Sequence, residues 1–314
     1  MERLRIGLIG WGTVGTALGR LIGGGPLPLA LARLAVREPE RERATALPTG
    51  VEIVAPAALT ESDDLDVIVE LAGGINGPLD WARDTLGRGR PYVTANKALL
   101  ATYGAELASI ASDNPGAALL GSASVGGGAP MIETVEHLAA TGQVTRLRGL
   151  LNATTTFILS AMAAGRDYEE ALLAAQRAGF AEADPSFDVE GRDAAQKLAI
   201  LASVGWGRWR PERDVETRGI VGIDVEPGRI VRLVAEADDE NLQVRPMELL
   251  PGVALASASG VEGMLEIEVR DAGTFRVSGP GAGGRVTAAA VYADLARVVA
   301  GERPILFAPT PRSR

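Results

Sequence analysis

A glycine-rich turn near the start of the chain constrains the fold most strongly. Residues 4–9 form a short apolar run that leads into Gly10-Trp11-Gly12-Thr13-Val14-Gly15, followed by helical periodicity over 16–21. A strand, a G-x-G-x-x-G turn and a helix in this order are typical of the first βα unit of a Rossmann domain. The first glycine allows the tight turn, the second lets a pyrophosphate approach the backbone, and the third lets the helix pack on the strand. We therefore expect residues 10–15 to bind a dinucleotide, with a βα turn that binds no ligand as the alternative.

Strand-like and helix-like segments alternate through the first 125 residues. We expect strands at 31–36, 51–54, 65–71, 91–94 and 117–122, and helices at 79–86 and 101–112. This alternation predicts an α/β fold with a doubly wound parallel sheet. Gly73 lies in the turn after the expected strand 65–71, and Lys97 comes soon after the expected strand 91–94. Both therefore lie at the edge where open α/β sheets bind ligands.

The end of the second expected strand bears on the choice of cofactor. Arg37 and Glu38 lie there, next to each other. In Rossmann domains an acid at this place binds the ribose hydroxyls of NAD, whereas an arginine accepts the 2′-phosphate of NADP. Arg37 stands at the strand end, so the sequence favours NADP over NAD.

The second half of the chain predicts a different architecture. Residues 124–130 are rich in glycine, which suits a hinge, a close approach to a ligand, or carbonyls offered to a cation. Further expected elements are helices at 131–140, 157–164, 168–178 and 287–299, strands at 145–151, 230–235, 243–249 and 265–269, and a glycine loop at 277–284. We expect a dinucleotide-binding domain at 1–125, an α+β catalytic and dimerisation domain at 126–284, and a C-terminal helix and tail at 285–314 that pack on the first domain.

One acidic stretch contains a lysine that stands out. Between residues 179 and 201 five acids, Glu182, Asp184, Asp188, Glu190 and Asp193, precede Lys197. Asp193 and Lys197 are i and i+4, so a helix would place them on one face. Of 31 basic residues only Lys97 and Lys197 are lysines. A desolvated ammonium can release its proton near neutral pH and a guanidinium cannot, so both lysines are candidates for acid–base chemistry. The alternative is an exposed ion pair that contributes little stability.

Composition excludes several classes of function. The chain has no cysteine and one histidine, His137, which we interpret as a packed or solvated helix residue. Thiolate nucleophiles, disulfides and multi-histidine metal sites are therefore excluded. A net charge of −9 argues against nucleic acid and anionic membranes as partners. The chain shows no signal peptide and no apolar run of membrane-spanning length, so we expect a cytoplasmic location.

Six motifs together resemble one family. They are GLIGWGTVG, VTANKALLA, SASVGGGAP, GLLNATTTFILSAM, GFAEADPSFDVEGRDAAQKLAILA and GPGAGGRVTAAAVYADL, and they span residues 7–297. The chain resembles the homoserine dehydrogenases in all six. The resemblance implies reversible NAD(P)-dependent interconversion of L-homoserine and L-aspartate 4-semialdehyde, in the biosynthesis of threonine, methionine and isoleucine. It also implies a homodimer.

The resemblance assigns roles to individual residues. It implies that Lys197 is the general acid/base and that Lys97 lies near the nicotinamide and substrate. It places substrate-binding residues at Glu182, Asp193, Asp188, Thr154 and Phe180, and it counts Asp193 and Asp188 among the catalytic residues as well. It places further cofactor contacts at Gly73, Gly179 and Gly281, and a structural sodium ion on the backbone carbonyls of Val125, Gly127 and Ala129.

Several positions depart from the family pattern. Ser122 replaces a glutamate of the sodium loop, Ala153 and Thr156 change the usual N-G-T-T-N, Phe180 replaces a common tyrosine, and an asparagine near Gly263 is missing. We see no C-terminal ACT regulatory domain, so we expect no feedback inhibition through one. The departures leave two alternatives, a non-catalytic NAD(P)-binding homologue and a dehydrogenase of another amino-acid aldehyde.

Overall fold

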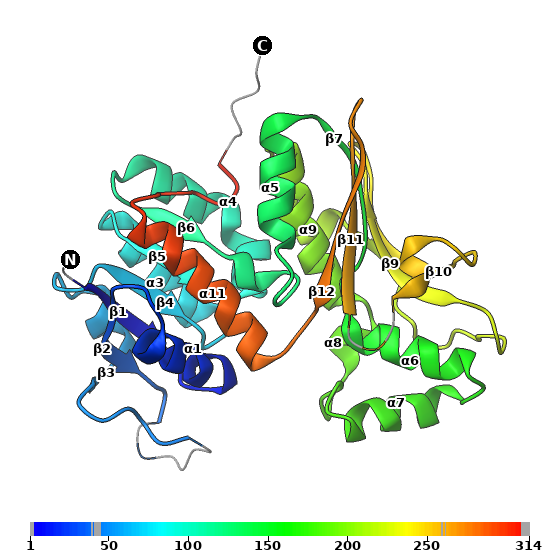
Figure 1. The fold of residues 1–314 in the computed structure, drawn as a ribbon, viewed down its shortest axis with the longest axis horizontal. Helices are drawn as coiled ribbons and strands as arrows, with labels where there is room; N and C mark the ends of the chain where they lie inside the picture. The colour runs from blue at the N-terminus through cyan, green and yellow to red at the C-terminus, as the bar shows by residue number, and fades with distance from the viewer. Residues whose placement is uncertain (1–2, 39, 41–44, 259, 261, 309–314) are drawn as a thin grey trace. The chain divides into compact units, whose positions relative to one another are not determined.

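The computed structural model describes residues 3–38, 40, 45–258, 260 and 262–308. The chain forms two compact units, the first from Met1–Gly128 and Gly283–Ala308, the second from Ala129–Ala282. The second unit is thus an insertion in the first, and both crossings lie in glycine-rich segments. Figure 1 shows the elements of both units.

The first unit contains a six-stranded sheet. Its strands are β1 (Leu4–Ile9), β2 (Leu29–Ala35), β3 (Glu52–Val54), β4 (Val67–Glu70), β5 (Pro91–Thr94) and β6 (Ala118–Leu120). The order is β3-β2-β1-β4-β5-β6 and every neighbouring pair is parallel. This order confirms the doubly wound Rossmann fold. The strand order reverses between β1 and β4, which is where such sheets bind ligands.

Helices cover this sheet, and the last one comes from the far end of the chain. The helices are α1 (Thr13–Gly24), α2 (Pro56–Thr60), α3 (Asn76–Gly87), α4 (Lys97–Asp113), the 3-10 turn η1 (Ser122–Ser124) and α11 (Gly284–Val299). Helix α11 packs beside α1 (Figure 1) and shares one apolar core with it and with β1. The hydroxyl of Tyr292 on α11 accepts a hydrogen bond from the Leu27 N–H at 3.1 Å. Helix α11 is therefore an integral part of the first unit.

The second unit has a mostly antiparallel sheet. Its strands are β7 (Val144–Leu150), β8 (Glu216–Thr217), β9 (Val231–Ala237), β10 (Leu242–Glu248), β11 (Glu262–Val269) and β12 (Gly273–Pro280), in the order β12-β11-β7-β9-β10-β8. Only the short β8–β10 pair is parallel among the pairs described. The helices of this unit are α5 (Met131–Thr141), α6 (Ala153–Ala163), α7 (Tyr168–Arg177), α8 (Ser186–Val189), α9 (Arg192–Trp206), η2 (Glu212–Asp214) and α10 (Ala254–Ser257).

Helix α9 is the central helix of the second unit. It packs against α5 and against strands β7, β9 and β10. Every residue from Asp193 to Trp206 is buried except Lys197, which is partly exposed. A helix this apolar on all sides is a core element. Lys197 therefore projects from a helix that is buried on almost every side.

Two helices begin earlier than the sequence suggested. We expected a helix only from residue 157, whereas α6 begins at Ala153 because the Asn152 side chain accepts a hydrogen bond from the Thr155 N–H at 2.8 Å. Helix α4 likewise begins at Lys97 and not at 101, because Asn96 accepts from Leu99 N–H at 3.1 Å. In both cases a capping asparagine offsets a weak helical pattern. Lys97 therefore lies in the first turn of a helix.

Two further expectations about local structure were wrong. The glycine loop expected over 277–284 begins later, because residues 277–280 end the strand β12, which pairs along its length with β11. The expected helices also lacked the single turn α8, which forms between Pro185 and Gly191. A one-turn helix leaves almost no periodic signal in a sequence, and the Gly279-Pro280 pair that ends β12 is typical of a loop.

Candidate active site

The glycine turn between β1 and α1 forms an open cradle. Gly10 has a φ of +106°, and a Cβ on Gly15 would lie 2.2 Å from the Gly10 carbonyl oxygen. Both positions therefore require glycine. A Cβ on Gly12, by contrast, would meet nothing within 4 Å. Thr13 and Val14 start α1, whose first N–H groups have no partner within the helix. The residues present fit a bound pyrophosphate.

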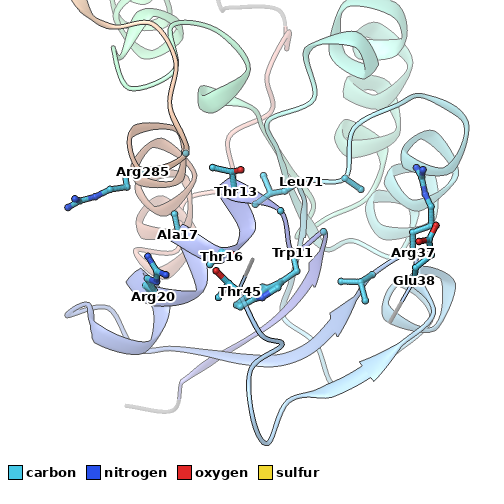
Figure 2. A pocket seen from close by; sticks show the side chains of 15 residues that line it. Trp11, Thr13, Thr16, Ala17, Arg20, Arg37, Glu38, Thr45, Leu71 and Arg285 are labelled. Atoms are coloured by element: carbon cyan, nitrogen blue, oxygen red, sulfur yellow. The ribbon is translucent and has the colours of Figure 1, made fainter. Parts of the chain in front are cut away.

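Two cavities flank the carboxyl ends of the β1 and β2 strands. The first, of about 840 Å³, is lined by residues 10–13 together with Arg20, Arg37, Thr45 and Arg285, among others (Figure 2). Arg20 and Arg285 lie on one side of it and Arg37 lies on the other, with Trp11 between them. The second cavity, of about 740 Å³, is lined by Arg37, Gly73, Gly74 and Trp81, among others. Arg37 thus borders both cavities.

Arg20 and Arg285 line the first cavity and were not among the expected site residues. A signal was available for Arg20, because it follows Thr13 by seven residues and therefore lies on the same face of α1, two turns later. No such signal existed for Arg285, which approaches from the other end of the chain.

A cluster of charged groups surrounds Lys197 in the second unit. The Lys197 Nζ donates to the Leu151 carbonyl oxygen and to Asp193 Oδ2, both at 2.8 Å. The side chains of Lys197 and Asp193 are only 15% and 7% exposed. The i,i+4 pair that the spacing predicts is confirmed, and it is not the exposed ion pair of the alternative interpretation. The ammonium is enclosed by acceptors and is largely shielded from water.

Asn152 joins the two aspartates of the cluster. Its Nδ2 donates to Asp193 Oδ2 at 2.8 Å and to Asp188 Oδ1 at 2.6 Å. The Thr154 hydroxyl lies 3.2 Å from Asp188 Oδ2 and 2.6 Å from the Phe180 carbonyl oxygen. Burial raises the pKa of the Asp188 carboxyl, and the neighbouring charge of Asp193 raises it further. The Lys197 ammonium relieves the repulsion between the two carboxylates only in part, so a second cation placed here would relieve it further.

Local sequence explains how the cluster is built. Gly191 has a φ of +85° and precedes α9, so the chain turns sharply before Arg192. Asp193 then lies in the first helical turn, where the helix dipole favours a negative charge. Lys197 follows one turn later on the same face. Asn152 was not among the expected site residues, although an asparagine between a strand and a helix is a common capping signal.

Other expected site residues lie apart from this cluster. Glu182 lies in an exposed stretch between α7 and α8, and no hydrogen bond or ion pair joins its carboxylate to the cluster within the described residues. Gly179 lies two residues after the end of α7 with a φ of +75°, and Gly281 directly follows β12. Phe180 is partly exposed, and its ring centroid is 5.1 Å from that of Phe157.

The expected sodium loop is buried. Val125, Gly127 and Ala129 lie in it, and the Ala129 carbonyl accepts the Met131 N–H at 2.7 Å. Ser122, at the position of the family glutamate, donates its hydroxyl to the buried Asp294 at 2.6 Å. Among the described residues no three acids or histidines are grouped as a metal site. No described helix is both long and apolar enough to span a bilayer.

The parallel sheet, the open glycine cradle at its switch point and the enclosed amine among carboxylates define a dinucleotide-dependent oxidoreductase. Family models for homoserine dehydrogenase match residues 130–296, and for its NAD-binding domain residues 10–119. The chain belongs to the homoserine dehydrogenase family. It is therefore an oxidoreductase that interconverts L-homoserine and L-aspartate 4-semialdehyde with a nicotinamide dinucleotide.

Individual relatives agree with this assignment. The chain is 34% identical to the homoserine dehydrogenase of Bacillus subtilis over 96% of its own length and 74% of that protein. It is 36% identical to that of Corynebacterium glutamicum, covering 92% and 70% of the two chains. The solved enzyme of Thiobacillus denitrificans superposes with a TM-score of 0.90 at 31% identity, over 95% of this chain and 74% of that one. A hyperthermophilic archaeal homoserine dehydrogenase in complex with NADPH gives 0.85 at 27% identity, over 97% and 100%.

Proposed function

We propose that Lys197 is the general acid/base of the homoserine reaction in this chain. The observation that carries the proposal is the enclosure of its ammonium between the Leu151 carbonyl and Asp193. When bound, the dinucleotide supplies or accepts the hydride. The oxygen on the substrate's terminal carbon must gain a proton when the aldehyde becomes an alcohol, and must lose one in reverse. An ammonium at Lys197 can deliver and recover that proton, whereas a guanidinium cannot.

The carboxylates around Lys197 suit the other end of the substrate. Homoserine and aspartate semialdehyde both carry an α-ammonium group. We assign its binding to Asp188 and Asp193, with Glu182 joining from the neighbouring exposed stretch. Asn152 fixes the positions of the two aspartates relative to each other, because its Nδ2 donates to both. Thr154 and Phe180 form the adjoining wall, and Lys97 contributes a second cation near the reacting oxygen.

Substitution of Lys197 tests this proposal. Lys197→Ala should lower kcat by about 10²- to 10⁴-fold, the usual contribution of general acid–base catalysis, while the Kd for NADPH stays unchanged. Lys197→Arg is the sharper variant, because it keeps the charge but removes the transferable proton. Steady-state rates with homoserine and fluorescence titration with NADPH measure the two quantities.

A matched control is available on the same helix. Arg192→Ala removes an exposed cation that pairs with Glu190 at 2.9 Å, outside the cluster. It should leave kcat close to that of the parent protein. A Lys197→Arg protein with parental kcat would refute the role of Lys197, and so would an equal loss in Arg192→Ala.

We propose that NADP is preferred over NAD, with Arg37 as the residue that binds the 2′-phosphate. Its position on both cavities supports this assignment. Arg37→Gln should lower kcat/KM for NADP by about tenfold, the loss of one charge-assisted contact, and leave NAD unaffected. Arg20→Gln serves as the control, because Arg20 lines the first cavity from α1 and not from the end of β2, so its loss should not distinguish NADP from NAD. An equal effect of Arg37→Gln on NAD and NADP would contradict the assignment.

We propose two finer features on the same basis. The carbonyls of Val125, Gly127 and Ala129 bind a sodium ion, supported by the burial of their loop and the left-handed φ of +81° and +59° at Gly126 and Gly127. A higher melting temperature in sodium chloride than in choline chloride of equal ionic strength would support this site, and equal values would count against it. The chain also forms a homodimer through the second unit, whose edge strand β12 is largely exposed.

A further inference from the structure

A buried glutamate in the first unit lies at the centre of a hydrogen-bond network. Glu70 is the last residue of β4 and is fully buried. Its Oε1 accepts from the N–H groups of Ala72 and Gly73 at 2.7 and 2.8 Å. Its Oε2 accepts from the Thr94 hydroxyl at 2.7 Å. The carboxylate therefore joins the turn after β4 to the end of the neighbouring strand β5 by hydrogen bonds.

The network continues through Thr94 and Asn96 and closes on itself. The Thr94 hydroxyl accepts from the Asn96 N–H at 2.9 Å. The Asn96 Nδ2 then donates to the Gly74 carbonyl at 2.7 Å, while its Oδ1 caps α4. Glu70, the 72–74 turn, Asn96 and Thr94 thus form a closed ring of hydrogen bonds.

The two structures that this ring joins both belong to the expected site. The first is the turn at Gly73 and Gly74, which lines the second cavity and has φ values of +70° and +84°. A Cβ on either glycine would meet nothing within 4 Å, so side-chain packing does not fix the turn. The second is the start of α4, whose first residue is Lys97.

Burying a carboxylate in order to stabilise a turn carries an unfavourable free energy of desolvation. An ionised group loses much of its hydration on burial, and the loss is offset only when several donors surround it. Hydrogen bonds to a charged acceptor are shorter and stronger than neutral ones, which suits a backbone that glycine leaves mobile. A brace of this strength is expected where geometry matters to a ligand.

We propose that Glu70, Thr94 and Asn96 are positioning residues that hold the 72–74 turn and the Lys97 helix start as one rigid piece, ready for the dinucleotide. The part that concerns Lys97 rests on the proposed function, whereas the part that concerns cofactor binding does not. The ring acts through the backbone it holds, and its three side chains take no part in the chemistry.

The isosteric change Thr94→Val tests the proposal, because it removes the hydroxyl and keeps the volume. The Kd for NADPH, measured by isothermal titration, should rise about tenfold, as expected for losing a hydrogen bond to a charged group. The amides of Ala72 and Gly73 should exchange hydrogen faster with solvent. Under saturating NADP, kcat should also fall if Lys97 is displaced. Thr94→Ser restores the hydroxyl and should restore both the Kd and the slow exchange.

Thr85→Val is the matched control. Thr85 is equally buried, on α3, and its hydroxyl makes no hydrogen bond within the described part of the chain. Its substitution should leave the Kd unchanged. If Thr94→Val fails to fold, Asn96→Ser replaces it, since serine can still cap α4 but is too short to reach the Gly74 carbonyl.

Two results would overturn the proposal. One is parental NADPH affinity and parental amide exchange in Thr94→Val, or in Asn96→Ser where that variant replaces it. The other is equal weakening in Thr94→Val and Thr94→Ser, which would assign the effect to packing. Because affinity and exchange need no turnover, a parent protein that binds NADPH but does not oxidise homoserine would defeat the proposed function and leave this test intact.

Discussion

At the scale of single residues, the surroundings of Asp188 disfavour the ionised form of its carboxyl. Burial, and then the charge of Asp193, raise the pKa of its carboxyl above the ordinary value of 3.8. The folded protein therefore binds this proton more tightly than the unfolded chain does. It follows that folding stability decreases as pH rises from the ordinary pKa through the raised one, and stays lower above it.

Asp188→Asn should therefore stabilise the protein at neutral pH while lowering activity. The amide fits the hydrogen bonds present: its oxygen can accept from Asn152, and its Nδ2 can donate to Thr154, whose proton goes to the Phe180 carbonyl. We expect the melting temperature to rise by about 2 °C at pH 7, with the gain shrinking toward about pH 4. Thermal melts at both pH values check this. A lower melting temperature than the parent at pH 7 would contradict it, as would parental kcat/KM for homoserine.

Much of the setting of Lys197 could be predicted from sequence, and Asn152 shows the limit. The scarcity of lysine singled out residues 97 and 197, and the i,i+4 spacing predicted the Asp193 pair. Asn152 contacts Asp188 and Asp193 from 36 and 41 residues away. Contacts of that separation depend on how β7 and α9 pack, which local patterns do not specify.

At the scale of elements, the turn into α1 contains glycines that are needed for two different reasons. Gly15 has no room for a Cβ against the Gly10 carbonyl, whereas Gly12 faces open space with an ordinary φ of −87°. Gly15 therefore serves packing of the fold. We propose that Gly12 is required by the bound dinucleotide.

Gly15→Ala and Gly12→Ala should consequently fail in different ways. Gly15→Ala should lower the free energy of unfolding by about 1–3 kcal/mol, the cost of overpacking, and weaken NADPH binding as well. Gly12→Ala should leave stability within about 0.5 kcal/mol and raise the Kd for NADPH. Chemical denaturation and NADPH titration of both proteins check the pair. A stable Gly15→Ala protein would show that the helix can shift to make room.

Element boundaries were predictable where periodicity was strong and not elsewhere. Strands β1, β4 and β5 were expected within two residues of each end because continuous apolar runs mark buried parallel strands. The starts of α4 and α6 were missed because a single capping side chain decided them. Strand β12 was missed because Gly273, Gly279 and Pro280 at its two ends are typical of loops, although the residues between them favour a strand.

At the scale of the whole molecule, the β sheet of the second unit ends in an unprotected edge. Strand β12 pairs only with β11 among the described strands, and Phe275 on it is 40% exposed. A long open edge favours pairing with another chain. The order of this sheet could not be predicted, because partners such as Val144 and Val269 are far apart in sequence.

The proposed homodimer should therefore depend on β12. Sedimentation equilibrium of the parent protein should give twice the chain mass of 32.6 kDa. Phe275→Lys should shift the distribution toward the single chain, because a charged edge disfavours pairing. The control Leu250→Lys changes a side chain that is 74% exposed in the turn after β10, and it should leave the dimer intact. A parent protein that sediments as one chain would disprove the dimer.

The insertion of one unit into the other also sets an order of events during translation. Helix α11 supplies Ala288, Val291, Leu295 and Val298 to the core it shares with β1 and α1. The first unit begins to be synthesised first, but its apolar core is incomplete until this last helix leaves the ribosome. Residues 129–282 are contiguous in the chain, so the second unit is fully synthesised earlier. The second unit can thus fold before the first. A chain truncated before α11 would expose the apolar face that α11 covers and would be prone to aggregate.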